Sequence, residues 1–456
     1  MKFKLVNIGP IRDAEIELGD FTLFLGLPST GKSFALRSIY SSLIFLDKEY
    51  ELSLSNDLYF LLGRAKTGTD YVISYLESLV KEGYDICDPD ALENIIEVVK
   101  KEHNFDISGT IEDGCLIKIS ERVNLLEKLE NVAPLIKEEI EDGYLKLLRK
   151  SVNYIDDISS IYINGKRAED LIENLEISPE DFSSKTYGML MTTKGDDIKY
   201  EVSGDYKDGI LKINAEIEPI IKGKINKKLS FEKVQTLKPE IIRSFVIRYK
   251  LLSKKIAEDL VKEYASKVGF VSSIIFIPYC RSELELLDEK TTSICSSVID
   301  VEEETIVKSF SPLKNIDPFI RNFLFHIDNA KEKIRRNDVK DSYILNLIYA
   351  ITKTRVKVDE KSRILFEIQN GAELEPFYAS AMINEVTSIL MPLLDLQTPA
   401  LVLIEEPESR LHLAHQILLL LAMLSLVQHG YKFVISTHSD LMASFLGDLV
   451  EYKPSK

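Results

Sequence analysis

The chain has 456 residues, of which 57 are basic and 73 acidic, so its formal net charge at pH 7 is −16. A hydrophobic share of 45% and a charged share of 29% are typical of a globular protein, and the length allows more than one domain. The acidic balance excludes attraction to nucleic acid by overall charge, so any such contact needs a local basic patch.

The first 50 residues predict two strands, a loop and a helix. Apolar residues alternate at Ala14, Ile16 and Leu18, as in a half-exposed strand, and residues 21–25 are typical of a buried strand. Residues 26–33 read Gly-Leu-Pro-Ser-Thr-Gly-Lys-Ser, which matches the pattern G-x-x-x-x-G-K-[ST] in full. Apolar residues at helical spacing follow as far as Leu46.

This loop predicts a phosphate-binding site for ATP. Glycines let the backbone curl so that N–H groups point at phosphate oxygens, and the following helix adds its positive end. We expect Lys32 to reach the β- and γ-phosphates and the Ser33 hydroxyl to ligate Mg²⁺. An accidental glycine turn is the alternative, which the preceding strand and following helix disfavour. The rest of the predicted cradle is Gly26, Leu27, Pro28, Ser29, Thr30 and Gly31.

Residues 51–270 predict a mixed α+β insertion. Turn dipeptides such as Asn164-Gly165 separate short segments, and apolar residues alternate over 198–202 and 211–217 as they do in strands. A helix is expected near residues 246–268. The insertion also contains one basic cluster, made of Lys222, Lys224, Lys227, Lys228 and Lys233.

Residues 271–456 return to buried-strand patterns with helical segments between them. The apolar runs cover residues 274–277, 364–368, 400–404 and 432–436, and their alternation with helices predicts a mainly parallel α/β sheet. A second basic cluster comprises Lys331, Lys333, Arg335 and Arg336. Either cluster could contact DNA phosphates, but such runs are more often solvated faces.

Acidic residues follow the strand at 400–404, at the end where α/β sheets place ligands. We expect Glu405 to bind Mg²⁺, directly or through water, and Glu406 to polarise the attacking water. His438 follows the next strand and is expected to sense the γ-phosphate. A solvated acidic strand end and a structural histidine are the alternatives. The phosphate loop in the same chain favours the catalytic interpretation.

Three segments together resemble the ABC-type ATPases of the SMC, RecF and OLD group, particularly OLD-like or "AAA-type" ATPases of prokaryotes. Residues 5–11 resemble the first strand of that family, residues 404–412 its Walker B and D-loop, and residues 436–440 its His switch. The resemblance implies an α/β fold with a split ABC-type P-loop NTPase core and a large α+β insertion between Walker A and Walker B. The expected domains are residues 1–50, 51–270 and 271–456.

The resemblance also implies an ATP-dependent homodimer. Residues 378–385 resemble the family's signature segment, so Ser380 is expected to contact, in trans, the ATP held by the other protomer. Ala381 stands where the family has glycine, and a plain helix cap at Ser380 is an equal alternative. Arg281, in a Pro-x-x-Arg segment, is expected near the phosphates or the dimer interface, or in a surface ion pair.

Mg²⁺-dependent ATP hydrolysis that drives a DNA-linked process, in repair or anti-phage defence, is the implied function. OLD nucleases carry a TOPRIM domain after the ATPase, for which this chain has no room, so DNA and a separate nuclease or effector protein are the expected partners. Two alternatives stay open. One is a nucleotide-gated protein-interaction scaffold with weak turnover, suggested by the missing glycine, and the other is an ABC transporter ATPase subunit.

Cysteine usage and the apolar runs favour a cytoplasmic protein. Cys87, Cys115, Cys280 and Cys295 are far apart and show no C-x-x-C spacing, which argues against a zinc site or a disulfide scaffold. No signal peptide is visible at the start. The longest apolar run, residues 417–427, is too short to span a bilayer and predicts a buried core helix.

Overall fold

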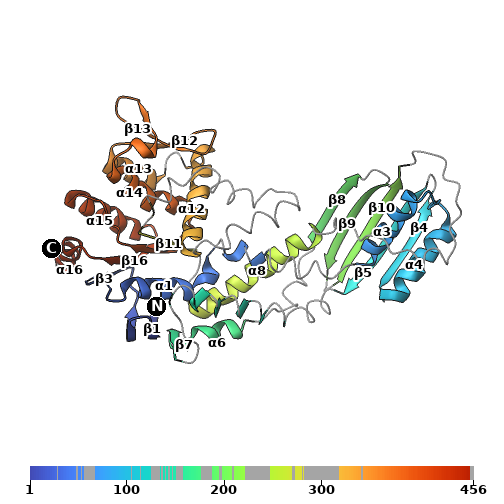
Figure 1. Ribbon diagram of the computed structural model, residues 1–456, viewed down its shortest axis with the longest axis horizontal. Helices are drawn as coiled ribbons and strands as arrows, with labels where there is room; N and C mark the ends of the chain where they lie inside the picture. The colour runs from blue at the N-terminus through green and yellow to red at the C-terminus, as the bar shows by residue number, and fades with distance from the viewer. Residues whose placement is uncertain are drawn as a thin grey trace. The chain divides into compact units, whose positions relative to one another are not determined.

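The computed structural model divides the chain into two compact units (Figure 1), each described by itself. The larger unit comprises Met1–Glu51, Glu141–Asn174 and Val261–Lys456, and the smaller unit comprises Leu52–Ile140 and Leu175–Leu260. The residues that the structure describes are 1–27, 29–47, 50–52, 54–55, 67–103, 105–112, 115–124, 134, 137–138, 140–141, 144–145, 147–149, 152, 158–175, 187–194, 198–207, 210–220, 247–269, 273–279, 281, 318–339 and 342–451.

A four-stranded parallel sheet forms the centre of the larger unit. Its strands lie in the order β11 (Ser273–Ile277), β15 (Ala400–Glu405), β16 (Tyr431–Thr437) and β3 (Phe21–Leu25), and each neighbouring pair is parallel. Every residue of β15 is buried, as expected for a strand covered on both faces. The predicted α/β class with a parallel sheet is therefore confirmed.

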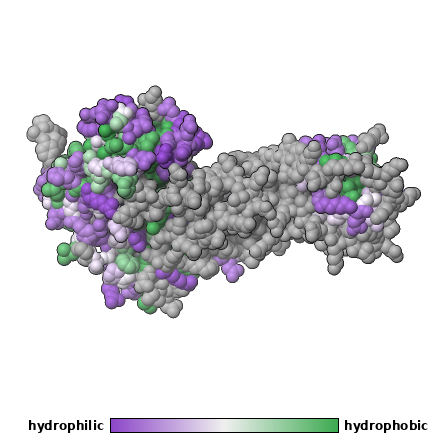
Figure 2. Space-filling model, turned by 45° about the horizontal axis from the view of Figure 1, so that its top comes forward, coloured by the Kyte–Doolittle hydropathy of each residue, from purple (hydrophilic) through white to green (hydrophobic). Residues whose placement is uncertain are grey.

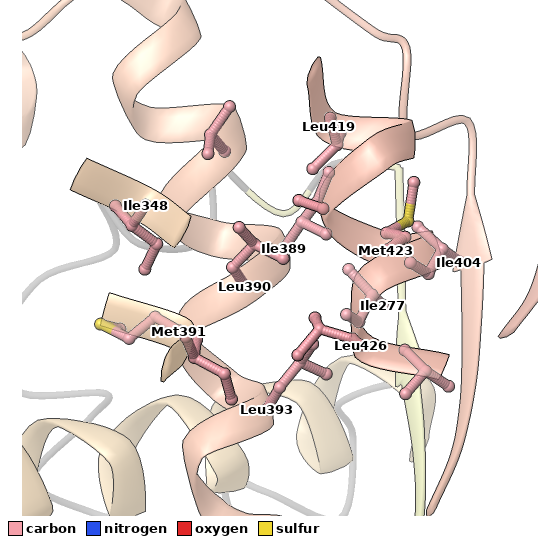
Figure 3. Packing of buried hydrophobic residues seen from close by; sticks show 14 of the residues in the cluster. Ile277, Ile348, Ile389, Leu390, Met391, Leu393, Ile404, Leu419, Met423 and Leu426 are labelled. Carbon is pink, nitrogen blue, oxygen red and sulfur yellow. The ribbon is translucent and has the colours of Figure 1, made fainter. Parts of the chain in front are cut away.

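Successive side chains of a strand point to opposite faces of the sheet, so an apolar run makes both faces apolar, and helices cover both. Alternate strand residues, including Ile277 and Ile404, belong to a large apolar cluster with the helices of one face. In Figure 3, Met423 and Leu426 of α15 lie beside these two isoleucines. The elements that contribute to the cluster are α12 (Pro318–Arg335), α13 (Tyr343–Thr352), α14 (Ala381–Leu390), η5 (Met391–Asp395) and α15 (Leu413–Val427).

The other face of the sheet packs against α1 (Lys32–Ser42), the helix that follows the phosphate loop. Tyr40 of α1 meets Phe276 of β11 edge to face, with ring centroids 5.6 Å apart. Each fully buried side chain of this kind contributes about 1.5–3 kcal/mol by leaving water. The loop is thus fixed between β3, an edge strand of the sheet, and a helix that is itself anchored to the sheet.

Two antiparallel sheets complete the larger unit. The first has the order β2 (Ile11–Glu17), β1 (Lys2–Ile8), β6 (Ser160–Ile163) and β7 (Lys166–Arg167), followed by α6 (Ala168–Glu173). The second consists of β12 (Arg355–Val358), β13 (Ile364–Glu367) and β14 (Glu373–Leu374). The remaining elements are η1 (Ile44–Leu46), η4 (Pro376–Tyr378) and α16 (Asp440–Glu451).

Two sequence expectations differ from this arrangement. The run at 364–368 was expected to join the parallel sheet, but it forms β13 of the separate antiparallel sheet, since it is short and followed at once by the turn to β14. Residues 141–174 were placed in the insertion, whereas β6 pairs with β1 through Leu5 and Ile161 in the larger unit. The run at 364–368 pairs with the strands next to it in sequence, whereas β6 pairs with a strand far away in sequence.

Among its described residues, the smaller unit contains a five-stranded antiparallel sheet, the helices α3 (Gly68–Lys81) and α4 (Pro89–His103), and part of α8 (Ile247–Val268). Apolar residues alternate along its strands, so one sheet face is buried and the other is polar, with ion pairs such as Lys118 with Glu112 and Glu216. The strand order is β4 (Asp106–Glu112), β5 (Leu116–Asn124), β10 (Ile210–Pro219), β9 (Ile198–Lys207) and β8 (Tyr187–Lys194). Helix α8 runs from this unit into the other.

A buried carboxylate caps α3. Glu121 of β5 accepts hydrogen bonds from the Gly68 and Thr69 amides, both 2.8 Å long, at the positive end of the helix. In the same unit Cys87 and Cys115 form a disulfide, which the sequence argument did not expect. Residues 28 apart in sequence become neighbours because the chain before α4 and the turn before β5 meet, which spacing alone does not reveal.

The surface and the helices of the larger unit follow the usual pattern. Figure 2 shows hydrophilic residues over much of the described surface, with smaller hydrophobic areas between them. Within the described ranges, no helix is both long enough and apolar enough to cross a bilayer. The run at 417–427 lies in α15, where Leu419, Leu420 and Met423 are buried while Leu418 and Leu421 are exposed.

Candidate functional site

The phosphate loop begins directly after β3 and ends at the first turn of α1. Gly31 is the N-cap of α1 and has φ +97°, a left-handed value that favours glycine. A Cβ at this position would lie 3.0 Å from Ile11 Cγ1, so both the backbone and the space require glycine. Ser29 also has a positive φ of 62°. Pro28 lies outside the described residues.

Within the loop, polar side chains bond to the loop's own carbonyls. The Lys32 ammonium donates to the carbonyl oxygens of Gly26 at 2.7 Å and of Leu27 at 2.8 Å. The Thr30 hydroxyl donates to Leu27 at 2.9 Å, and Ser33 is exposed at the start of α1. The lysine ammonium has only donors, so an anion bound in the loop would accept hydrogen bonds from Lys32 in place of these two carbonyl oxygens.

The carboxyl ends of three adjacent strands bring the predicted residues to one edge of the sheet. Thr437 of β16 is paired with Leu25 of β3, and Glu405 of β15 is paired with Ser436 of β16. The phosphate loop, Glu406 and His438 therefore each follow a strand end at this edge. Parallel α/β sheets place their ligands at such an edge.

Glu406 and His438 face each other across the ends of β15 and β16. Their side chains approach to 3.3 Å between Nε2 and Oε1, and both are about one-third exposed. The Glu406 amide donates to Ser436 O at 2.9 Å, and its φ of 46° lies in the left-handed region. The His438 amide donates to the Glu408 carboxylate at 2.6 Å, which fixes the start of the segment after β16.

Glu405 is held by an arginine that the sequence argument missed. Arg37, on α1, places Nε 3.2 Å from Glu405 Oε1 and Nη2 3.4 Å from Oε2. The same guanidinium lies 5.3 Å from the ring centroid of Phe319 on α12. An arginine inside a helix has no distinctive sequence signal, so only the packing of α1 on the sheet shows this contact.

Arg281 lies at the end of β15, in the interior of the larger unit. It is fully buried, donates hydrogen bonds to backbone carbonyls at the end of β15, and forms an ion pair with the carboxylate of Glu385. The surface ion pair is therefore wrong, and the contacts that the structure gives Arg281 are with the acidic segment itself. Its guanidinium contacts Glu405 and Glu406 through their main chain.

Ser380 is the N-cap of α14, and its hydroxyl accepts a hydrogen bond from the Ile383 amide at 3.4 Å. Ser380 is exposed, so the cap leaves it accessible from outside. The two residues of η4 beside it are also exposed, Phe377 by 76% and Tyr378 by 71%. The structure thus shows the capping role directly and leaves the role in trans as a prediction.

The two basic clusters give no open basic patch among the described residues. The cluster at 222–233 lies outside them. In the second cluster Lys331 pairs with Asp328, Lys333 with Asp395, and both Arg335 and Arg336 with Glu332. These four side chains share three neighbouring carboxylates, which reduces their attraction for phosphate.

Comparison with known proteins gives one family. The model described as AAA ATPase domain (AAA_15) matches residues 1–443. No curated protein matches the chain. One similar solved structure is an SmcHead bound to the C-winged helix domain of ScpA, at 11% identity and a TM-score of 0.32, covering 97% of this chain and 90% of that one.

A second similar structure is an Smc head domain with an extended coiled coil, bound to the C-terminal domain of ScpA and derived from Pyrococcus furiosus. It is 10% identical with a TM-score of 0.31, and the match covers 97% of this chain and 90% of that one. At TM-scores this low, the likeness supports no conclusion about this chain.

Proposed function

Since the chain belongs to the AAA ATPase domain family, we propose that it binds ATP with Mg²⁺ and hydrolyses the bond between the β- and γ-phosphates, which gives ADP and inorganic phosphate. One observation carries the proposal. A complete G-x-x-x-x-G-K-S loop near the start of the chain lies at the same sheet edge as Glu405, Glu406 and His438 near its end. A glycine turn without function gives no reason for this convergence.

The loop would hold the phosphates. Its amides and the positive end of α1 attract anions, and Lys32 already lies over the loop. The Ser33 hydroxyl and the Glu405 carboxylate are oxygen ligands of the kind that Mg²⁺ prefers, so their chemistry fits the ion. In the structure Arg37 contacts both oxygens of Glu405, so the ion would take the place of that arginine. Bound Mg²⁺ would neutralise charge that develops on the phosphates.

Glu406 and His438 would act on the reacting groups. The Glu406 carboxylate is partly exposed at the sheet edge, where it can accept a proton from a water molecule and orient it. His438, 3.3 Å from that carboxylate, can donate toward the phosphate. The pair would make the position of Glu406 depend on whether the γ-phosphate is present.

Hydrolysis of ATP by the purified protein, with Mg²⁺ and with EDTA, tests the proposal. We expect turnover that needs Mg²⁺, and a loss of at least about a hundredfold in kcat for Glu406→Gln with ATP binding retained. Glu375→Gln, an exposed glutamate near η4, serves as a control with unchanged turnover. Wild-type turnover that persists in Glu406→Gln would contradict the assigned base.

The finer parts of the proposal concern assembly and biology. ATP would join two copies with Ser380 acting in trans, so the molar mass of Glu406→Gln should double when ATP and Mg²⁺ are added. A cytoplasmic, DNA-linked role in repair or defence, with a separate effector protein, rests on the family resemblance alone. Stimulation of turnover by DNA would support it.

Ala381 favours a second candidate, a nucleotide-gated scaffold with weak turnover. A side chain replaces the glycine that allows close backbone approach to the partner's ATP. Slow turnover in the wild type together with ATP-dependent dimerisation would support this candidate over a motor.

A further inference from the structure

A fully buried arginine joins the end of β15 to α14. Arg281 follows β11, and its guanidinium Nη1 donates to Glu405 O at 2.8 Å and to Pro278 O at 3.1 Å. Nη2 donates to Glu406 O at 3.0 Å. Arginine offers five donors in a rigid fork, so it can fix several acceptors at once, which lysine cannot do.

These bonds reach a residue whose backbone is in the left-handed region. Glu406 has a φ of 46°, and a non-glycine residue in that region costs about 1–2 kcal/mol unless its surroundings hold it there. Its N–H is held by Ser436 O, and its carbonyl accepts from Arg281 and from the Ser409 amide. Arg281 thus holds one side of the peptide that aims the Glu406 side chain.

The same arginine is tied to α14 by an ion pair. Its Nε lies 3.0 Å from Glu385 Oε2, and both side chains are buried. The other oxygen of Glu385 lies 3.9 Å from Arg410 Nε, in the segment that follows Glu406. Glu385 is on the helix capped by Ser380, the residue proposed to contact the partner's ATP.

From these contacts we infer that Arg281 is a positioning residue. It sets the backbone of Glu406 and, through Glu385, makes that position depend on where α14 lies. This inference rests on the proposed function, because it concerns the base of that reaction. If a second copy displaced α14, Glu385 would move Arg281, and Arg281 would move the Glu406 carbonyl. Neither contact involves the nucleotide.

A purely structural pair would behave differently. Buried ion pairs can often be replaced by apolar residues without loss of stability, whereas removal of one partner generally destabilises the fold. Such a loss of stability does not lower kcat specifically while sparing the affinity for ATP. An arginine that positions the base instead affects kcat while leaving ATP binding intact. The separation of these constants is therefore the readout.

The test compares Arg281→Lys and Glu385→Gln with the wild type. Lysine keeps the buried charge but cannot reach all the acceptors, and glutamine keeps the shape of Glu385 without its charge. We expect kcat to fall at least tenfold in Arg281→Lys, with the affinity for ATP within threefold of wild type. In the double variant, kcat should fall less than the product of the two single losses.

Asp395→Asn is the matched control. It removes a buried carboxylate of the same unit that contacts neither Glu405 nor Glu406, so it should lower the unfolding midpoint and leave kcat unchanged. If Arg281→Lys fails to fold, Glu385→Gln alone decides the outcome. Wild-type kcat in a folded variant, or equal losses of kcat and ATP affinity, would overturn the inference. A wild type without turnover would instead overturn the proposed function, and this inference with it.

Discussion

Asp395, at the end of η5, is a buried carboxylate whose partners determine its charge. His326 Nδ1 and Asn329 Nδ2 each lie 2.9 Å from its Oδ2, and Lys333 Nζ lies 3.0 Å from Oδ1. Burial by itself raises the pKa of Asp395, but the hydrogen bonds and charge of His326, with the bonds from Asn329 and Lys333, outweigh it and lower the pKa to about 2 from 3.8. The ionised form is thus favoured in the folded state.

This lowered pKa predicts a pH-dependent contribution to stability. A depressed folded-state pKa stabilises the fold above the unfolded pKa, near 4, and the contribution disappears as the pH falls toward about 2. Its size is about 2 kcal/mol, at about 1.4 kcal/mol per pH unit. We expect the free energy of unfolding in urea to differ between wild type and Asp395→Asn by less at pH 3 than at pH 6. A difference independent of pH would contradict this assignment.

Arg37 occupies both carboxylate oxygens of Glu405, the proposed Mg²⁺ ligand. Because the arginine and the ion compete for the same oxygens, Arg37→Met should lower the Mg²⁺ concentration needed for half-maximal ATP binding. A threefold decrease or more is expected. Arg335→Met, which affects only the surface pair with Glu332, is the control. A higher Mg²⁺ requirement in Arg37→Met would show that the arginine supports the site.

Residues with a local signal were predictable, and residues with only tertiary partners were not. Lys32 and Ser33 belong to a contiguous pattern, and Glu405 and His438 directly follow apolar runs. Arg37 has no such context, and the Pro-x-x-Arg segment of Arg281 does not identify its partners, because in both cases the partner lies far away in sequence. Sequence patterns therefore predicted the candidate nucleotide ligands, but not the arginine contacts that hold Glu405 and Glu406.

At the scale of elements, α14 offers a way to separate two roles of Ser380. Aspartate caps helices about as well as serine does, so Ser380→Asp should preserve the stability of α14 while its charge repels a phosphate of the partner. We expect ATP-dependent dimerisation in the Glu406→Gln background to weaken at least tenfold. Ser342→Asp, at the N-cap of α13, is the matched control and should dimerise normally. Normal dimerisation of Ser380→Asp would leave Ser380 only as a cap.

Strands β11 and β15 of the parallel sheet were predictable because each is a continuous apolar run, as burial on both faces favours. Residues 21–25 were also expected to form a buried strand, but β3 lies at the sheet edge and is only partly buried. Run 364–368 has similar composition but forms an antiparallel strand, since composition does not identify the pairing partner. The pairing of β6 with β1 joins residues about 155 apart, and no local pattern gives such a register. The Cys87–Cys115 disulfide was missed for the same reason.

At the scale of the whole molecule, the chain leaves the larger unit after α1 and returns to it to complete the sheet. The cost of closing a long loop grows only slowly with its length, so a compact unit of its own can interrupt a core without preventing assembly. The candidate site therefore needs both ends of the chain. This dependence on two distant segments is the central claim.

The affinity of the protein for ATP, measured by titration calorimetry in Mg²⁺ and again in EDTA, tests that claim most directly. Lys32→Ala, near the start of the chain, should weaken binding in both conditions, because Lys32 acts on the phosphates themselves. Glu405→Gln, near the end, should weaken binding at least tenfold in Mg²⁺ and leave it unchanged in EDTA, because Glu405 acts through the metal. If Glu405→Gln binds ATP in Mg²⁺ as tightly as the wild type, the two ends of the chain do not share one nucleotide site.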